Sequence, residues 1–86
     1  MREVEVVIKD EVGLHARPAA EFVKLASRFK SNVTIEVKGK KAVAKSILEV
    51  LSLGAKKDDA MLIRAEGDDE DEAASSLSKH ISTAGQ

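Results

Sequence analysis

Short stretches of alternating apolar and polar residues predict four β-strands. In REVEVVIK, at positions 2–9, valine and isoleucine alternate with charged residues, and NVTIEVK at 32–38 repeats this period of two. Such alternation is typical of a strand with one face on a core and the other in water. A turn at Gly39 leads into a short third strand through Ala42 and Val43, and AMLIRAE at 60–66 supplies the fourth. The side chains expected to face the core are those of Val4, Val6, Ile8, Val33, Ile35, Val37, Met61, Ile63 and Ala65.

Between these strands the apolar residues recur at helical spacing, which predicts three helices. The first covers roughly residues 16–29, with an apolar stripe of Ala19, Phe22, Val23, Ala26 and Phe29. The second begins in SILE at 46–49, a capping-box pattern with Ser46 as N-cap and Glu49 three residues later, and stops at Gly54. The third follows the acidic segment DDEDE at 68–72, where Asp68 or Asp69 is expected to cap the helix.

The predicted element order is β-α-β-β-α-β-α. Strands with one wet face suit an antiparallel sheet whose other face is covered by helices. We therefore expect an α+β fold, an open-faced β-sandwich in which a four-stranded antiparallel sheet carries three helices on one face. No linker, repeat or low-complexity tract divides the 86 residues, so residues 1–86 are expected to form a single domain.

Composition excludes several classes of partner and ligand. The formal net charge is -1 and the chain has no Trp or Tyr, so neither a basic surface nor aromatic stacking favours nucleic acid. There is no cysteine, and EGDDEDE at 66–72 lacks the order of a calcium loop, so no metal site is expected. No apolar signal region or membrane-spanning run is present, which predicts a cytoplasmic protein without membrane insertion.

The segment GLHARPAA, at positions 13–20, places His15 where the first helix should have its N-cap. Imidazole is not among the side chains that best cap a helix, so one explanation for a histidine at this position is a requirement other than helix stability. The free amides of the first turn and the Arg17 guanidinium would favour a phosphoryl group there, and neutral imidazole is a nucleophile that can accept one. The other interpretation is a surface histidine at a helix end. The local pattern alone leaves both open.

Four segments together resemble the HPr family of the phosphoenolpyruvate-dependent sugar phosphotransferase system. They are GLHARPAA, FVKLASRF at 22–29, AKSILEVLSLGA at 44–55 and AEGDDEDEA at 65–73, and the resemblance spans essentially the whole chain. It implies a phosphoryl carrier rather than a free-standing enzyme. His15 would accept phosphate on Nδ1 from phosphorylated enzyme I and pass it to a sugar-specific enzyme IIA, with Arg17 as the cationic phosphate partner. No cofactor is implied, and we expect a monomer with transient partners.

The same resemblance implies a partner-binding surface and a second phosphorylation site. The surface would include Ala16, Arg17, Ala20, Ile47, Leu48 and Leu51. Ser46 is the position that a dedicated HPr kinase/phosphorylase modifies in some members of the family. Glu49 replaces a glycine common in those members, and its carboxylate would repel a phosphate on Ser46. Val12 stands where the family commonly has a small polar residue.

Two other functions are compatible with the resemblance. One is a regulatory binding module that acts through phosphorylated Ser46 bound to a transcriptional regulator. Relatives specialised in this way tend to lack the active histidine, so His15 and Arg17 favour the carrier. The other is a carrier in a nitrogen-linked phosphotransferase chain, which the sequence separates less well from a sugar-linked one.

Overall fold

Four strands form one antiparallel sheet in the computed structural model, which describes residues 1–83. The strands are β1 (Arg2–Val7), β2 (Asn32–Val37), β3 (Lys40–Val43) and β4 (Ala60–Glu66). Their order in the sheet is β1-β4-β2-β3, so β4 pairs with both β1 and β2 although it comes last in the chain. The hairpin predicted at Gly39 joins β2 to β3, and its two turn residues, Lys38 and Gly39, both have positive φ.

The inward faces of the strands are those predicted from the alternation. Ile63 in β4 lies opposite Val4 on one side and Ile35 on the other, and this row of side chains runs across the middle of the sheet. The β2 and β4 residues in the core are almost fully buried, whereas Val4 and Val6 in the edge strand are partly buried and pack against it. The period-two prediction is therefore confirmed.

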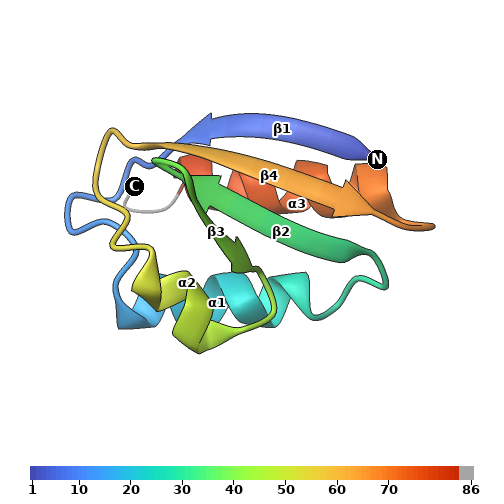
Figure 1. Ribbon diagram of the computed structural model, residues 1–86, viewed down its shortest axis with the longest axis horizontal. Coiled ribbons are helices and arrows are strands. Elements are labelled where there is room, and N and C mark those ends of the chain that lie inside the picture. Colours follow the sequence, from blue (N-terminus) through green and yellow to red (C-terminus); the bar gives the residue numbers. More distant parts are fainter. Residues whose placement is uncertain (84–86) are drawn as a thin grey trace.

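Three helices cover one face of this sheet, as expected for an α+β open-faced sandwich (Figure 1). They are α1 (Ala16–Ala26), α2 (Ile47–Ser52) and α3 (Glu70–Thr83). Helix α3 packs on β1 and β4, while α2 lies beside α1 and contacts β3. Among residues 1–83 no helix is both long and apolar enough to cross a membrane.

Helix α1 ends at Ala26, so the predicted extension to residue 29 is wrong. The amides of Arg28 and Phe29 donate to carbonyl oxygens only three residues back, at 3.1 and 3.2 Å, which tightens the chain into turns. The Ser27 hydroxyl also donates to the Val23 carbonyl at 2.8 Å. Phe29 still packs against the core, and so it continued the helical stripe in the sequence without being part of the helix.

The start of α2 fulfils only half of the predicted capping box. The Ser46 hydroxyl accepts the Glu49 amide at 3.4 Å, as expected. The Glu49 carboxylate does not return to the Ser46 amide, because that amide already donates to the Val43 carbonyl at 3.1 Å. The Glu49 carboxylate instead accepts a hydrogen bond from the Val43 amide at 3.0 Å, which ties α2 to the edge strand β3. Gly54 follows the helix with φ 60°, the left-handed position expected of it.

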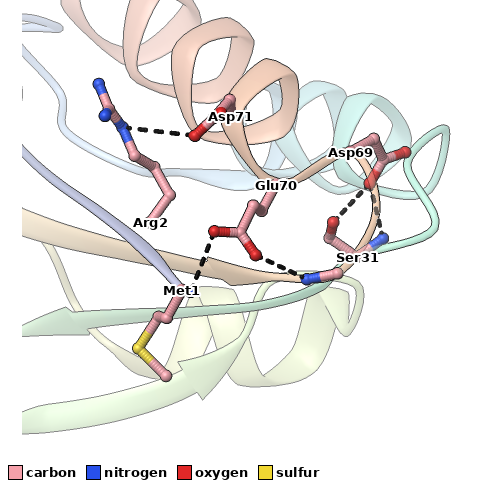
Figure 2. Close-up of polar contacts among 7 residues, drawn as sticks. Met1, Arg2, Ser31, Asp69, Glu70 and Asp71 are labelled. Atoms are coloured by element: carbon pink, nitrogen blue, oxygen red, sulfur yellow. Dashed lines mark hydrogen bonds and ion pairs between the residues drawn. The ribbon is translucent and has the colours of Figure 1, made fainter.

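The start of α3 is tied to the loop between α1 and β2 (Figure 2). The Asp69 carbonyl accepts the Ala73 amide at 2.9 Å, so Asp69 is the residue at the helix start. Its carboxylate accepts hydrogen bonds from the amides of Lys30 and Ser31, at 2.8 and 2.9 Å, and from the Ser31 hydroxyl. The Ser31 hydroxyl, followed by the Lys30 amide, lowers the pKa of Asp69. Asp69 therefore begins α3 and also connects it to the loop that follows α1.

Candidate functional site

His15 is the N-cap residue of α1, as the sequence predicted. Its backbone is extended, with φ -94° and ψ -174°, and its carbonyl accepts the first helical bond from Ala19 at 2.9 Å. The imidazole makes no capping hydrogen bond, and its side chain is 43% exposed. The ring is therefore accessible and is not used to stabilise the helix.

The loop before His15 is fixed by a close approach to the segment that follows α2. Gly13 has φ 85°, and a Cβ there would lie 2.8 Å from the Lys56 Cα and collide with the Ala55 carbonyl oxygen. That oxygen accepts the amide of Leu14 at 3.0 Å. Glycine is required at position 13 both for the left-handed backbone and for space, so the position of His15 depends on contacts between distant parts of the chain.

The first turn of α1 provides an environment suited to an anion. It contains no acidic residue, and Ala16 and Arg17 are exposed. The amides at the start of a helix have no intrahelical acceptor and carry its positive dipole end. The Arg17 guanidinium forms no ion pair with residues 1–83 and can bind oxygen atoms of a phosphoryl group. The start of α1 therefore has the donors and the positive charge that a phosphate group would need.

Asp10 is a member of this site that the sequence patterns did not single out. One carboxylate oxygen accepts the Val12 amide at 2.9 Å, and the other lies 4.0 Å from the His15 Nε2. The signal in the sequence was an aspartate in a loop. Such a side chain commonly accepts the backbone amide two residues further on and so forms a local turn. Val12 itself is 69% exposed, and its apolar side chain offers no hydrogen bond to the histidine.

The predicted partner-binding residues lie on two neighbouring helices (Figure 1). On α1, Ala16 and Ala20 are exposed together with Arg17. On α2, Val50 is buried, whereas Leu48 is 78% exposed. Ile47 and Leu51 are partly buried and pack against the core. Helix α2 therefore has more apolar side chains than one face can bury, and Leu48 is the most exposed of them.

Comparison with known proteins gives the family. The family model described as PTS HPr component phosphorylation site matches residues 2–83. The chain therefore belongs to the HPr family, the phosphocarrier proteins of the phosphoenolpyruvate-dependent phosphotransferase system, and it is a carrier rather than a catalytic enzyme.

Individual relatives agree along nearly the whole chain. The phosphocarrier protein HPr of Buchnera aphidicola subsp. Schizaphis graminum is 46% identical over 79 residues, which is 92% of this chain and 93% of that protein. A crystal structure of HPr from Thermoanaerobacter tengcongensis is 46% identical with a TM-score of 0.93, covering 99% of this chain and 96% of that one. A dimeric HPr structure from the same organism is 45% identical with a TM-score of 0.78, covering 100% and 99%.

Proposed function

We propose that His15 is the residue that carries the phosphoryl group, accepting it from phosphorylated enzyme I and donating it to an enzyme IIA. The observation that supports this most is the N-cap imidazole, which is exposed and makes no bond to the helix it begins. In this position a negatively charged group on the ring meets the amides of the first turn and the side chain of Arg17. His80, the other histidine among residues 1–83, lies near the end of α3 and has no such surroundings.

The transfer exchanges one bond for another. The lone pair of His15 Nδ1 attacks phosphorus, the bond from phosphorus to the donor atom of enzyme I breaks, and that atom leaves with the electron pair. Nε2 keeps its proton throughout. Transfer to enzyme IIA is the same step with His15 as the leaving group. The protein contributes position and charge stabilisation, which are the main sources of catalysis in phosphoryl transfer.

The docking surface proposed for both partners combines the exposed end of α1 with α2. It comprises Ala16, Arg17, Ala20, Ile47, Leu48 and Leu51. A small apolar surface beside the reacting ring suits brief contacts with successive partners, because neither complex needs a large buried area.

We propose that the protein works as a monomer in the cytoplasm. Sedimentation at micromolar protein concentration tests the oligomeric state. A stable dimer at that concentration would contradict the proposed monomer.

We propose that Ser46 is a regulatory site whose modification Glu49 opposes. Ser46 is partly exposed at the start of α2, and its hydroxyl accepts the Glu49 amide. A phosphate on Ser46 would be stabilised by the start of the helix and destabilised by repulsion from the Glu49 carboxylate. Incubation with ATP and an HPr kinase/phosphorylase should give an acid-stable phosphate that is absent from Ser46→Ala and increased in Glu49→Gly. An unchanged mass for all of them would reject the role, and with it any binding of the modified form to a transcriptional regulator.

The carrier role is tested by intact-mass measurement. The protein is incubated with phosphoenolpyruvate, magnesium and enzyme I, and its mass is measured before and after mild acid. We expect one acid-labile phosphate, absent from His15→Ala and retained in His80→Ala, which removes the other histidine. No addition to the wild type with several enzymes I, or an addition retained in His15→Ala, would contradict the proposal. Onward transfer to sugar-linked and nitrogen-linked enzyme IIA proteins then identifies the pathway.

A further inference from the structure

The two carboxylate oxygens of Asp10 face different groups. Oδ1 accepts the amide of Val12 at 2.9 Å, and Oδ2 lies 4.0 Å from Nε2 of His15. From this arrangement we propose that Asp10 is a positioning residue for phosphoryl transfer, which keeps the proton of the His15 ring on Nε2 and so leaves Nδ1 free to accept the phosphoryl group. This inference rests on the proposed role of His15.

The carboxylate is held in place by its own loop. The Asp10 carbonyl accepts the amide of Gly13 at 2.9 Å, which closes a tight turn over residues 10–13, and the side chain accepts the Val12 amide inside that turn. Only 17% of the Asp10 side chain is exposed, against 43% for His15. The carboxylate is therefore the fixed group, and the more exposed ring can take up its orientation relative to the carboxylate.

An ionised carboxylate can only accept hydrogen bonds, and this decides which ring nitrogen carries the proton. A neutral imidazole has one N–H and one lone pair, and the hydrogen bond made by one nitrogen sets the state of the other. A carboxylate facing Nε2 favours the form with the proton on Nε2 and the lone pair on Nδ1. That is the form in which Nδ1 can attack phosphorus.

At 4.0 Å, Nε2 and the Asp10 carboxylate oxygen are too far apart for a hydrogen bond in the free protein. Contacts of this kind often shorten when the reacting complex forms. When Nδ1 gains the phosphoryl group while Nε2 keeps its proton, the ring becomes cationic, and a nearby carboxylate stabilises that charge. Asp10 and Arg17 would then act on opposite parts of the phosphorylated histidine, with Asp10 at the ring and Arg17 at the phosphate.

The neighbouring acid provides a matched control. Glu11 follows Asp10 in the same loop and is exposed, and it makes no hydrogen bond or ion pair with any residue in the described part of the chain. Neutralising Glu11 changes the net charge near His15 by the same amount as neutralising Asp10. A difference between the two variants therefore reports the contact with the ring and not the general field of the loop.

The test compares Asp10→Asn, Asp10→Ala and Glu11→Gln by two measurements. Asparagine keeps an oxygen for the Val12 amide but can turn its NH₂ group toward Nε2, which favours the opposite proton position. In the unphosphorylated protein, ¹⁵N shifts of the His15 ring should show the proton moving from Nε2 to Nδ1 in Asp10→Asn and staying in place in Glu11→Gln. Phosphorylation by enzyme I should slow by about two- to fivefold in Asp10→Asn, in the range set by exposed ion pairs.

Two results would overturn the proposal. One is an Asp10→Asn ring with the same proton position as the wild type. The other is a wild-type rate in Asp10→Asn combined with a slow Asp10→Ala, which would mean that Asp10 only shapes the loop. The ring measurement needs no phosphorylation, so a failure of enzyme I to phosphorylate the wild type would refute the carrier role separately.

Discussion

Asp69 accepts hydrogen bonds from both the backbone amide and the hydroxyl of Ser31, which lies 38 residues earlier in the chain. Ser31 is the one polar residue among those classed as buried in residues 1–83, with 1% of its surface exposed. Its hydroxyl donates to the Asp69 carboxylate, so the burial of that donor is compensated. The contact fixes the loop after α1 to the start of α3 (Figure 2). This loop follows the C-terminal end of α1, whereas His15 is the N-cap residue at its other end.

This contact predicts a dependence of stability on pH. The pKa of Asp69 is lowered, first by the Ser31 hydroxyl and then by the Lys30 amide, so the folded state prefers the ionised carboxylate. The stabilisation is complete above the ordinary aspartate pKa of about 3.9 and is lost as the pH falls through the lower value in the folded protein. In urea unfolding from pH 7 to pH 2, Asp69→Asn should lose less stability than the wild type.

Asp68→Asn is the matched control for that measurement. Asp68 is exposed and precedes Asp69. The lowered pKa values of Asp59 and Glu70 remain in both variants, so their contribution cancels when the curves are compared. Equal acid dependence in Asp69→Asn and the wild type would show that the Ser31 contact does not discriminate between the two forms of the carboxyl group.

Gly13→Ala should destabilise the protein more than Gly39→Ala. Both glycines have positive φ, 85° and 81°, and alanine in that conformation costs about 1 to 2 kcal/mol at either position. Only at Gly13 would the new Cβ also meet backbone, at Ala55 and Lys56, whereas nothing lies within 4 Å at Gly39. Overpacking adds about 1 to 3 kcal/mol. Urea unfolding measures the difference, and equal losses would mean that the loop can move away from Ala55.

Leu48→Ala should separate partner binding from folding. Its side chain is 78% exposed, so its loss should change the free energy of unfolding by less than about 0.5 kcal/mol. If Leu48 fills an apolar pocket of enzyme I, the KM for phosphorylation should rise by about fivefold or more. Val50→Ala, on the buried side of the same helix, should instead lower stability by about 2 kcal/mol. An unchanged KM in Leu48→Ala would remove this residue from the docking surface.

His80→Leu should stabilise the protein by about 1 kcal/mol, the typical cost of a buried polar atom without a partner. The Nε2 atom of His80 is buried and has no hydrogen-bond partner among residues 1–83, and the ring lies 6.3 Å from that of Phe22 in α1. Thermal unfolding of His80→Leu is compared with that of Lys79→Leu, which adds a leucine at the exposed neighbouring position. A lower Tm for His80→Leu would show that the histidine contributes an interaction of its own.

The features that could be predicted from the sequence are those encoded by local spacing. The strand faces, the hairpin at Gly39 and the N-cap position of His15 each follow from a few neighbouring residues, and all are confirmed. The end of α1 was missed because Phe29 packs on the core from a turn, at a spacing that also fits a helix. Burial was predicted correctly there, but the backbone conformation was not.

Side-chain partners were harder to predict, because polar groups bind whichever donor the fold brings close. The Glu49 carboxylate binds the amide of Val43 rather than that of Ser46, since the turn after β3 had already used the latter. Asp10 is a similar case. Its neighbours in the sequence suggest an ordinary loop, and only the turn over residues 10–13 brings its carboxylate toward His15.

The contact between Gly13 and the segment at Ala55 and Lys56 also restricts how relatives of this protein can diverge. The connection from α2 to β4 is usually the kind of surface loop in which insertions are tolerated. Here its first residues form one wall of the space that the loop before His15 occupies. A residue inserted before Ala55 would therefore displace a histidine 40 positions earlier in the sequence, so the length of this connection should vary among relatives only together with the segment around Gly13.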